Sequence, residues 1–214
     1  MEIIYKVLYS NRRSISAQIK NSKVLIRCPF NTPHKVINQF VLSNEKWIAK
    51  NLNKPTIDIV IEHNIKIEII GQEFLVEKTD KKTEISGNTL RVHNYSNEDK
   101  RVKSFIQLIK TLVYPYFKER LDIYTRMMDT SYLTFKTTSA NKRWGSCTSQ
   151  KIVHLSYQCG FLPHKLFDYI IVHELAHIKY MNHSKQFWEY LSMYIPNYKD
   201  IRKELKKYNI IYKL

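Results

Sequence analysis

Pro163–Ile178 is the segment that most constrains the fold of this chain, because the helix it predicts is apolar on nearly every face. Proline is favourable at the start of a helix, and the interior that follows contains Leu166, Phe167, Tyr169, Ile170, Ile171, Val172, Leu175 and Ala176. A helix of this composition has to be buried in a larger structure. It nevertheless carries His173, Glu174 and His177, and burying three ionisable groups is costly unless a bound cation compensates them.

These three residues form the pattern His-Glu-x-x-His. Two histidines four residues apart lie on one face of a helix, and the glutamate after the first lies beside them. A hydrolytic zinc site needs this arrangement, with imidazoles as ligands and a carboxylate next to the metal. The sequence therefore predicts a site for one zinc ion per chain.

His183 is the favoured third ligand. In an unbroken helix it would be turned by about 240° from His177 and advanced by about 9 Å, so the two could not share a metal. The helix must therefore end first. Asn182 tolerates a left-handed backbone, and Ser184 is a good N-cap for a following helix. We predict that the site helix ends between Tyr180 and Asn182 and that His183 turns back to the metal.

Glu189 and Glu204 are the alternative third ligands, since one class of zincins takes a glutamate from a following helix. The spacing of His183 equals that of the metzincins. Position 180 is tyrosine rather than the glycine of that group, however, and no Met-turn is evident after His183. We favour the three-histidine set without placing the chain among the metzincins.

A mechanism follows from three neutral imidazole ligands. The metal keeps its full charge, leaves a fourth position for water, and lowers the pKa of that water from about 16 to near 7. Glu174 is the expected general base, which passes the proton of the water to the leaving group. Arg143, His154 and Tyr157 are candidates for a second oxyanion donor or a substrate contact, because they lie on the segments just before the site helix.

The N-terminal half is predicted to be rich in strands. Strand patterns occur at Ile3–Tyr9, Ser14–Lys20 and Lys23–Cys28, and a second set of small antiparallel strands is expected between Ile57 and Val92. One helix lies between the two sets, with Thr32 as its N-cap, Pro33 at its first position and an apolar stripe that reaches Ile48. The polar segment Asn94–Lys100 is the best candidate for a linker.

The C-terminal half begins with a long helical pattern from Arg101 to Met128, which Pro115 should kink or divide. Two strands, Tyr132–Thr138 and Ile152–Tyr157, then lead into the site helix. This mixture of elements predicts an α+β protein.

Neither the distribution of apolar residues nor the cysteine content suggests a membrane protein or a secreted protein. No apolar run in the 214 residues approaches the roughly 20 needed to span a bilayer, and Met1–Ser14 lacks the apolar segment of a secretory signal. Cys28, Cys147 and Cys159 show no CxxC spacing and suggest no disulfide framework. We expect a cytoplasmic protein.

The formal net charge of +16 is a second notable feature. A surface this basic attracts polyanions, which makes nucleic-acid contact a hypothesis. The lysines are scattered along the chain rather than grouped in one block, as is also common in a solvated surface.

Several motifs together resemble the YgjP-like metal-dependent hydrolases, which are zincin-like metallopeptidases related more distantly to the WLM and SprT-like groups. The resemblance is specific from about Thr138 to Leu205 and is carried by Arg143-Trp144-Gly145-Ser146-Cys147, His173-Glu174-Leu175-Ala176-His177, Asn182-His183-Ser184, Phe187-Trp188 and Pro196-Asn197-Tyr198. It implies that His173, His177 and His183 bind zinc and that Glu174 is catalytic. The segment Val153–Gly160 differs from the Asn-Trp-Arg type of strand expected in relatives, and if this strand lines the substrate groove, a different substrate preference is expected.

The resemblance also implies an architecture. We expect a strand-rich lobe with one helix over residues 1–98 and a zincin-like metallopeptidase domain over residues 99–214, although the two can also form one compact unit. In the second domain a small antiparallel sheet should pack on the active-site helix.

Three functions are compatible with these observations. A metallopeptidase acting on peptides or proteins is the first, because zincins commonly hold an extended peptide along an edge strand above the site helix. A nucleoside triphosphate (UTP) pyrophosphatase is the second, since some family members carry that assignment; against it, the chain has no Gly-rich phosphate loop. A non-enzymatic nucleic-acid-binding module with structural zinc is the third, although structural zinc normally has four protein ligands.

Overall fold

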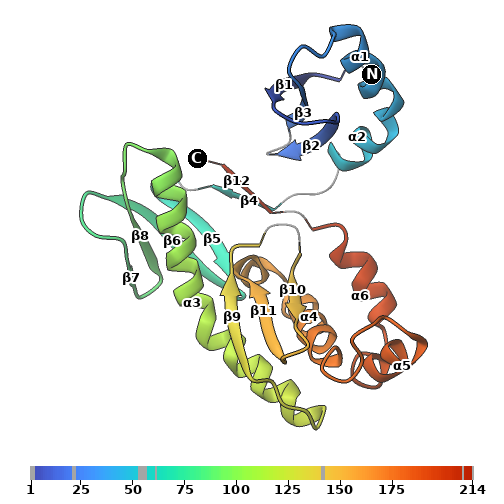
Figure 1. Ribbon diagram of the computed structural model, residues 1–214. Coiled ribbons are helices and arrows are strands. Elements are labelled where there is room, and N and C mark those ends of the chain that lie inside the picture. Colours follow the sequence, from blue (N-terminus) through green and yellow to red (C-terminus); the bar gives the residue numbers. More distant parts are fainter. Residues whose placement is uncertain are drawn as a thin grey trace. The chain divides into compact units, whose positions relative to one another are not determined.

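The computed structural model describes residues 3–20, 23–52, 57–60, 62–140, 143–208 and 210–213, and its elements form an α+β fold (Figure 1). The chain divides into two compact units, Met1–Asp58 with Lys207–Lys213 and Ile59–Lys206. The boundary expected after residue 98 falls inside the second unit. Strands before that position pack on the long helix after it, so the segment Asn94–Lys100 is an internal connection there.

The first unit contains a three-stranded sheet and two helices. The sheet has the order β1-β3-β2, with β1 parallel and β2 antiparallel to β3. The bounds are β1 Tyr5–Ser10, β2 Ser16–Lys20, β3 Lys23–Pro29, α1 His34–Ser43 and α2 Glu45–Leu52. Its core joins the inward face of β3 to the helices through Val24, Ile26, Cys28, Ile37, Val41 and Ile48. The three strands predicted in this region are confirmed. Asn21 and Ser22, where a tight connection between the last two strands is expected from the sequence, lie outside the described residues.

The single helix predicted in this unit is divided in two. Asn44 is the C-cap of α1, where its side-chain amide and its backbone amide both donate to the Phe40 carbonyl, at 2.8 and 3.2 Å. The predicted N-cap is also wrong. Pro33 occupies the cap position, and the Thr32 hydroxyl donates back to the Pro29 carbonyl at 2.8 Å instead.

The second unit begins with a four-stranded sheet of order β5-β6-β8-β7. Its strands are β5 Ile65–Ile69, β6 Gln72–Thr79, β7 Glu84–Ser86 and β8 Thr89–His93. The expected antiparallel arrangement is only partly present, because β6 and β8 run parallel while the other neighbours are antiparallel. The chain turns between these strands at Asn64, Gly71 and Gly87, whose φ angles are positive at 63°, 69° and 55°. A two-stranded sheet pairs β4 Ile57–Val60 with β12 Ile210–Lys213.

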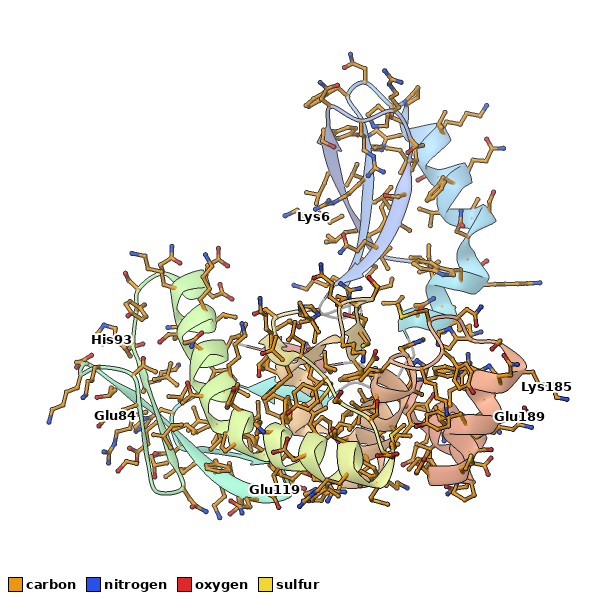
Figure 2. The ribbon with its side chains drawn as sticks, turned by 60° about the horizontal axis from the view of Figure 1, so that its bottom comes forward. Lys6, Glu84, His93, Glu119, Lys185 and Glu189 are labelled. Atoms are coloured by element: carbon orange, nitrogen blue, oxygen red, sulfur yellow. The ribbon has the colours of Figure 1, made fainter. Side chains whose placement is uncertain are left out.

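Helix α3 spans Glu98–Met127 and contains Pro115 without being divided. Asn97 caps it by accepting a hydrogen bond from the Lys100 amide at 3.0 Å. The ribbon changes direction along its length (Figures 1 and 2), as expected for a helix with an internal proline. No described helix is both long enough and apolar enough to cross a bilayer.

A second sheet in this unit, of order β10-β11-β9, leads into the buried helix α4. The elements are β9 Thr134–Thr138, β10 Gly145–Cys147, β11 Ile152–Ser156, the 3-10 turn η1 Tyr157–Phe161, α4 His164–Ala176, α5 Lys185–Tyr194 and α6 Tyr198–Leu205. The sheet is mixed rather than antiparallel, because the connection from β9 to β10 bypasses β11 and leaves β9 parallel to it. Helix α4 contacts β10, α3, α5 and α6, which accounts for its burial.

A partly buried ion pair ties α3 to α4. The Arg120 guanidinium donates to both oxygens of Asp168, at 2.8 and 2.7 Å. We expect Asp168→Asn to lower the free energy of unfolding by about 1–3 kcal/mol, since it leaves the guanidinium without its charged partner. Urea denaturation measures this change. The matched control is Glu73→Gln in the exposed Lys66–Glu73 pair, where an effect below about 1 kcal/mol is expected; equal effects would contradict the prediction.

Candidate metal centre

The end of α4 brings His183 back toward the helix. Helix α4 stops at Ala176, the following residues form a turn in which the Tyr180 amide donates to the Ala176 carbonyl at 2.9 Å, and α5 begins at Lys185. The predicted helix break before His183 is confirmed and lies a few residues earlier than expected. Ser184 caps α5 as predicted, accepting from the Phe187 amide at 3.4 Å. Asn182, which tolerates a left-handed backbone, does not have a positive φ here.

The three histidines of the sequence pattern converge. One ligand atom from each of His173, His177 and His183 lies within 4.8 Å of the others, and the Nε2 atoms of His173 and His183 are 3.1 Å apart. Two nitrogen ligands of a tetrahedral zinc ion, with bonds of 2.0–2.1 Å, would be separated by about 3.3 Å. The donor set and its spacing therefore fit a metal ion.

Hydrogen bonding and burial keep these imidazoles suited to metal binding. Nδ1 of His177 lies 3.1 Å from the Tyr180 carbonyl, so it donates its proton there and leaves Nε2 with a free lone pair. Burial, reinforced by His177 and His183, lowers the pKa of His173 to about 3. Burial also lowers the pKa of His183. Both rings are therefore neutral at pH 7, and protons do not compete with a metal.

Glu174 is buried between α4 and β10. Only 6% of the residue is exposed, and a Cβ atom built on Gly145 would lie 2.8 Å from both Cγ and Oε1 of Glu174. Burial raises the pKa of Glu174 to about 8, while the nearby charge of Arg143 opposes the shift. A carboxyl group in this range can both accept and release a proton near neutral pH.

A cavity of about 600 Å³ opens beside Glu174 and the histidines. Its lining comes from the segment before β10, from α4, α5 and α6, and includes Arg143, Trp144, Tyr169, His173, Glu174, His183, Trp188, Arg202 and Lys206. Of the three predicted oxyanion or substrate contacts, Arg143 lines this cavity. His154 lines a smaller neighbouring cavity of about 280 Å³. Tyr157 is 2% exposed and lines neither of the two.

The two rival ligands take part in ion pairs. Glu189 pairs with Lys185 at 3.5 Å, and both side chains extend from α5 at the surface in Figure 2. Glu204 pairs with Lys165 at 2.8 Å. Within the described part of the chain, the metal-ligand cluster at this site consists of the three histidines alone.

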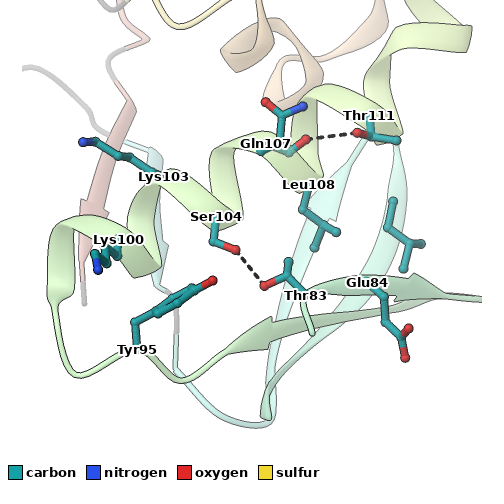
Figure 3. A pocket seen from close by; sticks show the side chains of 10 residues that line it. Thr83, Glu84, Tyr95, Lys100, Lys103, Ser104, Gln107, Leu108 and Thr111 are labelled. Carbon is teal, nitrogen blue, oxygen red and sulfur yellow. Dashed lines mark hydrogen bonds between the residues drawn. The ribbon is translucent and has the colours of Figure 1, made fainter. Parts of the chain in front are cut away.

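A larger cavity of about 790 Å³ lies between α3 and β7, lined by residues such as Thr83, Tyr95, Lys100 and Leu108 (Figure 3). The hydroxyls of Thr83 and Ser104 are hydrogen-bonded across it at 2.6 Å. None of the residues that line it belongs to the histidine cluster. Size alone therefore does not identify the functional site.

Sequence reasoning missed two contributors to the site. Gly145 has a recognisable signal, because glycine inside a strand often marks a close approach of other groups to the backbone. Arg202 has none, since it lies 19 residues beyond His183 on a helix whose charged pattern resembles any solvated face.

His173 and His183 line the cavity together with the buried Glu174, and His177 completes the histidine cluster beside it. Such an arrangement is typical of a metal-dependent hydrolase. The chain belongs to the YgjP-like metallopeptidase domain family, whose family model matches residues 13–208.

Solved structures similar to parts of the chain include two archaeal metallopeptidase zymogens. Abylysin of Pyrococcus abyssi is 18% identical, covers 44% of this chain and 99% of its own, and has a TM-score of 0.40. Jannalysin of Methanocaldococcus jannaschii is 23% identical, covers 42% of this chain and 94% of its own, and has a TM-score of 0.37. No curated protein matches the chain.

Proposed function

We propose that this protein is a zinc metallopeptidase acting on peptides or proteins, with one zinc ion held by His173, His177 and His183. The observation that carries the proposal is the convergence of three imidazoles beside the buried Glu174 at one cavity. Three neutral protein ligands leave a fourth position open, which is typical of catalytic zinc. This argues against the alternative in which zinc only stabilises a nucleic-acid-binding module.

The chain's own groups have distinct roles in the proposed reaction. A zinc ion in this site would supply a Lewis acid and lower the pKa of a water molecule to near 7. Glu174 accepts the proton of the attacking water and delivers it to the leaving amine. In this proposal Arg143 donates hydrogen bonds to the developing oxyanion, a role supported by its position on the lining of the same cavity.

We place this activity in the cytoplasm, where the three free cysteines Cys28, Cys147 and Cys159 would remain reduced. Nucleic-acid contact through the basic surface stays a prediction.

The proposal is tested with purified protein and an unfolded polypeptide such as casein. We expect about one zinc per chain by elemental analysis, cleavage of the polypeptide, and loss of cleavage after chelation that added zinc restores. Zinc-loaded protein that cleaves no polypeptide would contradict the peptidase function.

The ligand set has its own prediction. His183→Ala should weaken zinc affinity by more than about 100-fold. Mutating a residue that only orients a metal ligand already lowers metal affinity by about 10- to 100-fold, and losing the ligand itself should cost more. Glu189→Gln and Glu204→Gln, which alter the rival ligands, should retain zinc. Competition with a chromogenic chelator measures all three affinities, and zinc loss in either glutamine variant would assign the third ligand differently.

Nucleotide pyrophosphatase activity is a second candidate, favoured by one observation: Arg143, Arg202 and Lys206 all line the cavity. Triphosphates bind such cationic walls. Pyrophosphate release from UTP by the wild type, compared with His177→Ala, decides this candidate. It fails if release does not depend on the metal site.

A further inference from the structure

The cavity beside the candidate metal centre carries an excess of positive charge. Arg143, Arg202 and Lys206 line it, while Glu174 is the sole carboxylate among its described lining residues. Glu174 is buried and lies against Gly145. A substrate in the cavity therefore meets three cationic side chains on the same lining as His173 and His183.

Arg202 is held close to the histidines by an aromatic stack. Its Cζ atom lies 4.9 Å from the ring centroid of Trp188. Trp188 stacks on His183 with centroids 5.4 Å apart and on Tyr198 with centroids 5.2 Å apart. The guanidinium thus sits one aromatic ring away from a ligand histidine. A cation–π contact orients a guanidinium but leaves its hydrogen-bond donors free.

The charge of Arg202 is not neutralised within the described part of the chain, where it forms no ion pair. The same helix carries two acidic residues, Asp200 and Glu204. Glu204 is paired with Lys165 at 2.8 Å, and among the described residues Asp200 forms no ion pair with Arg202.

We infer that Arg202, supported by Lys206, binds a carboxylate of the peptide substrate beside the scissile bond and makes the enzyme selective for peptides that are acidic there. The inference rests on the proposed peptidase function. A guanidinium binds a carboxylate through two parallel hydrogen bonds, which adds direction as well as charge. The carboxylate comes either from an Asp or Glu side chain or from the free C-terminus of a short peptide.

Matched peptides test the inference and separate the two sources. One series carries Glu, Gln or Lys at each position next to the cleavage site, and a second compares a C-terminal acid with its amide. We expect kcat/KM to be at least about tenfold higher for the peptide that carries the carboxylate than for its neutral or cationic counterpart, because a hydrogen bond between charged groups contributes at least this much. A preference confined to the first series assigns the side chain, and one confined to the second assigns the C-terminus. Equal kcat/KM throughout both series would overturn the inference and leave the peptidase function intact.

Variants of α6 supply the controls. Arg202→Gln should abolish the preference without changing zinc content or Tm, whereas Arg202→Lys should restore part of it. Lys203→Gln removes a neighbouring charge that does not line the cavity and should keep the preference. Loss of selectivity in Lys203→Gln as large as in Arg202→Gln would show a general charge effect and overturn the assignment to Arg202.

Binding to the Glu174→Gln protein provides a readout that does not need turnover. By titration calorimetry, the Kd of the neutral peptide should be about tenfold higher than that of the acidic peptide. Adding Arg202→Gln should raise the Kd of the acidic peptide by the same factor. If zinc-loaded wild type cleaves no peptide, the proposed function fails, but this Arg202-dependent difference would still support the carboxylate site. The carboxylate site would be overturned if UTP bound tightly while the acidic and neutral peptides bound with equal Kd.

Discussion

Replacing Glu174 with glutamine is expected to lower kcat for peptide hydrolysis by about 10²- to 10⁴-fold, the range typical of a lost general base. Glutamine keeps the shape of the side chain but cannot accept a proton at neutral pH. Since Glu174 is not part of the histidine cluster, the zinc should remain. Removing a carboxyl group that is only 6% exposed should also not destabilise the fold.

The measurement pairs steady-state kinetics with the zinc content of the same sample. Glu189→Gln is the matched control, because it makes the same chemical change on exposed α5. A Glu174→Gln enzyme with wild-type kcat and full zinc would remove Glu174 from the mechanism.

Gly145→Ala is expected to reduce kcat by about 10²-fold while the protein remains folded. The new Cβ would lie 2.8 Å from Cγ and Oε1 of Glu174, so the buried carboxylate has to move. A displacement of about 1 Å in a catalytic group is enough for a loss of this size. Most of the effect should appear in kcat rather than in zinc affinity, because Gly145 approaches the base and not the histidines.

Ser146→Ala is the control for the Gly145 variant, since it alters the next residue of β10 without adding an atom near Glu174. Kinetics, zinc content and thermal unfolding should be measured for both variants. If Gly145→Ala keeps kcat within about threefold of the wild type, the close approach does not position Glu174. If it unfolds, the same contact supports the packing of α4 on β10 instead.

The buried helix and its break could be predicted because both depend on local chemistry. An apolar helix interior, a proline at its start and a serine cap at Ser184 act over a few residues, and the structure contains each of them. The histidine cluster follows from the same local geometry, because all three side chains lie within eleven residues.

Features that depend on competition or on distant contacts could not be predicted. The division between α1 and α2 falls at Asn44, whose side-chain and backbone amides both donate to the Phe40 carbonyl, and the apolar stripe that predicts one helix continues past this residue. The strand order could not be predicted either, because the parallel pairing of β9 with β11 results from a connection between β9 and β10 that passes the position of β11. Arg202 lies near the histidines because its guanidinium packs over the ring of Trp188, a contact between two helices that the sequence does not reveal.

The proposed chemical groups and the cavity wall of the site come from different parts of the sequence. The chemical groups, His173 to His183, are encoded in a single short stretch, whereas the cavity wall is assembled from the segment before β10, α5 and α6. We therefore expect substitutions in α6 to change which substrates are accepted without disturbing the groups that we propose perform hydrolysis. For protein engineering, α6 is accordingly the element to randomise when a new cleavage preference is sought.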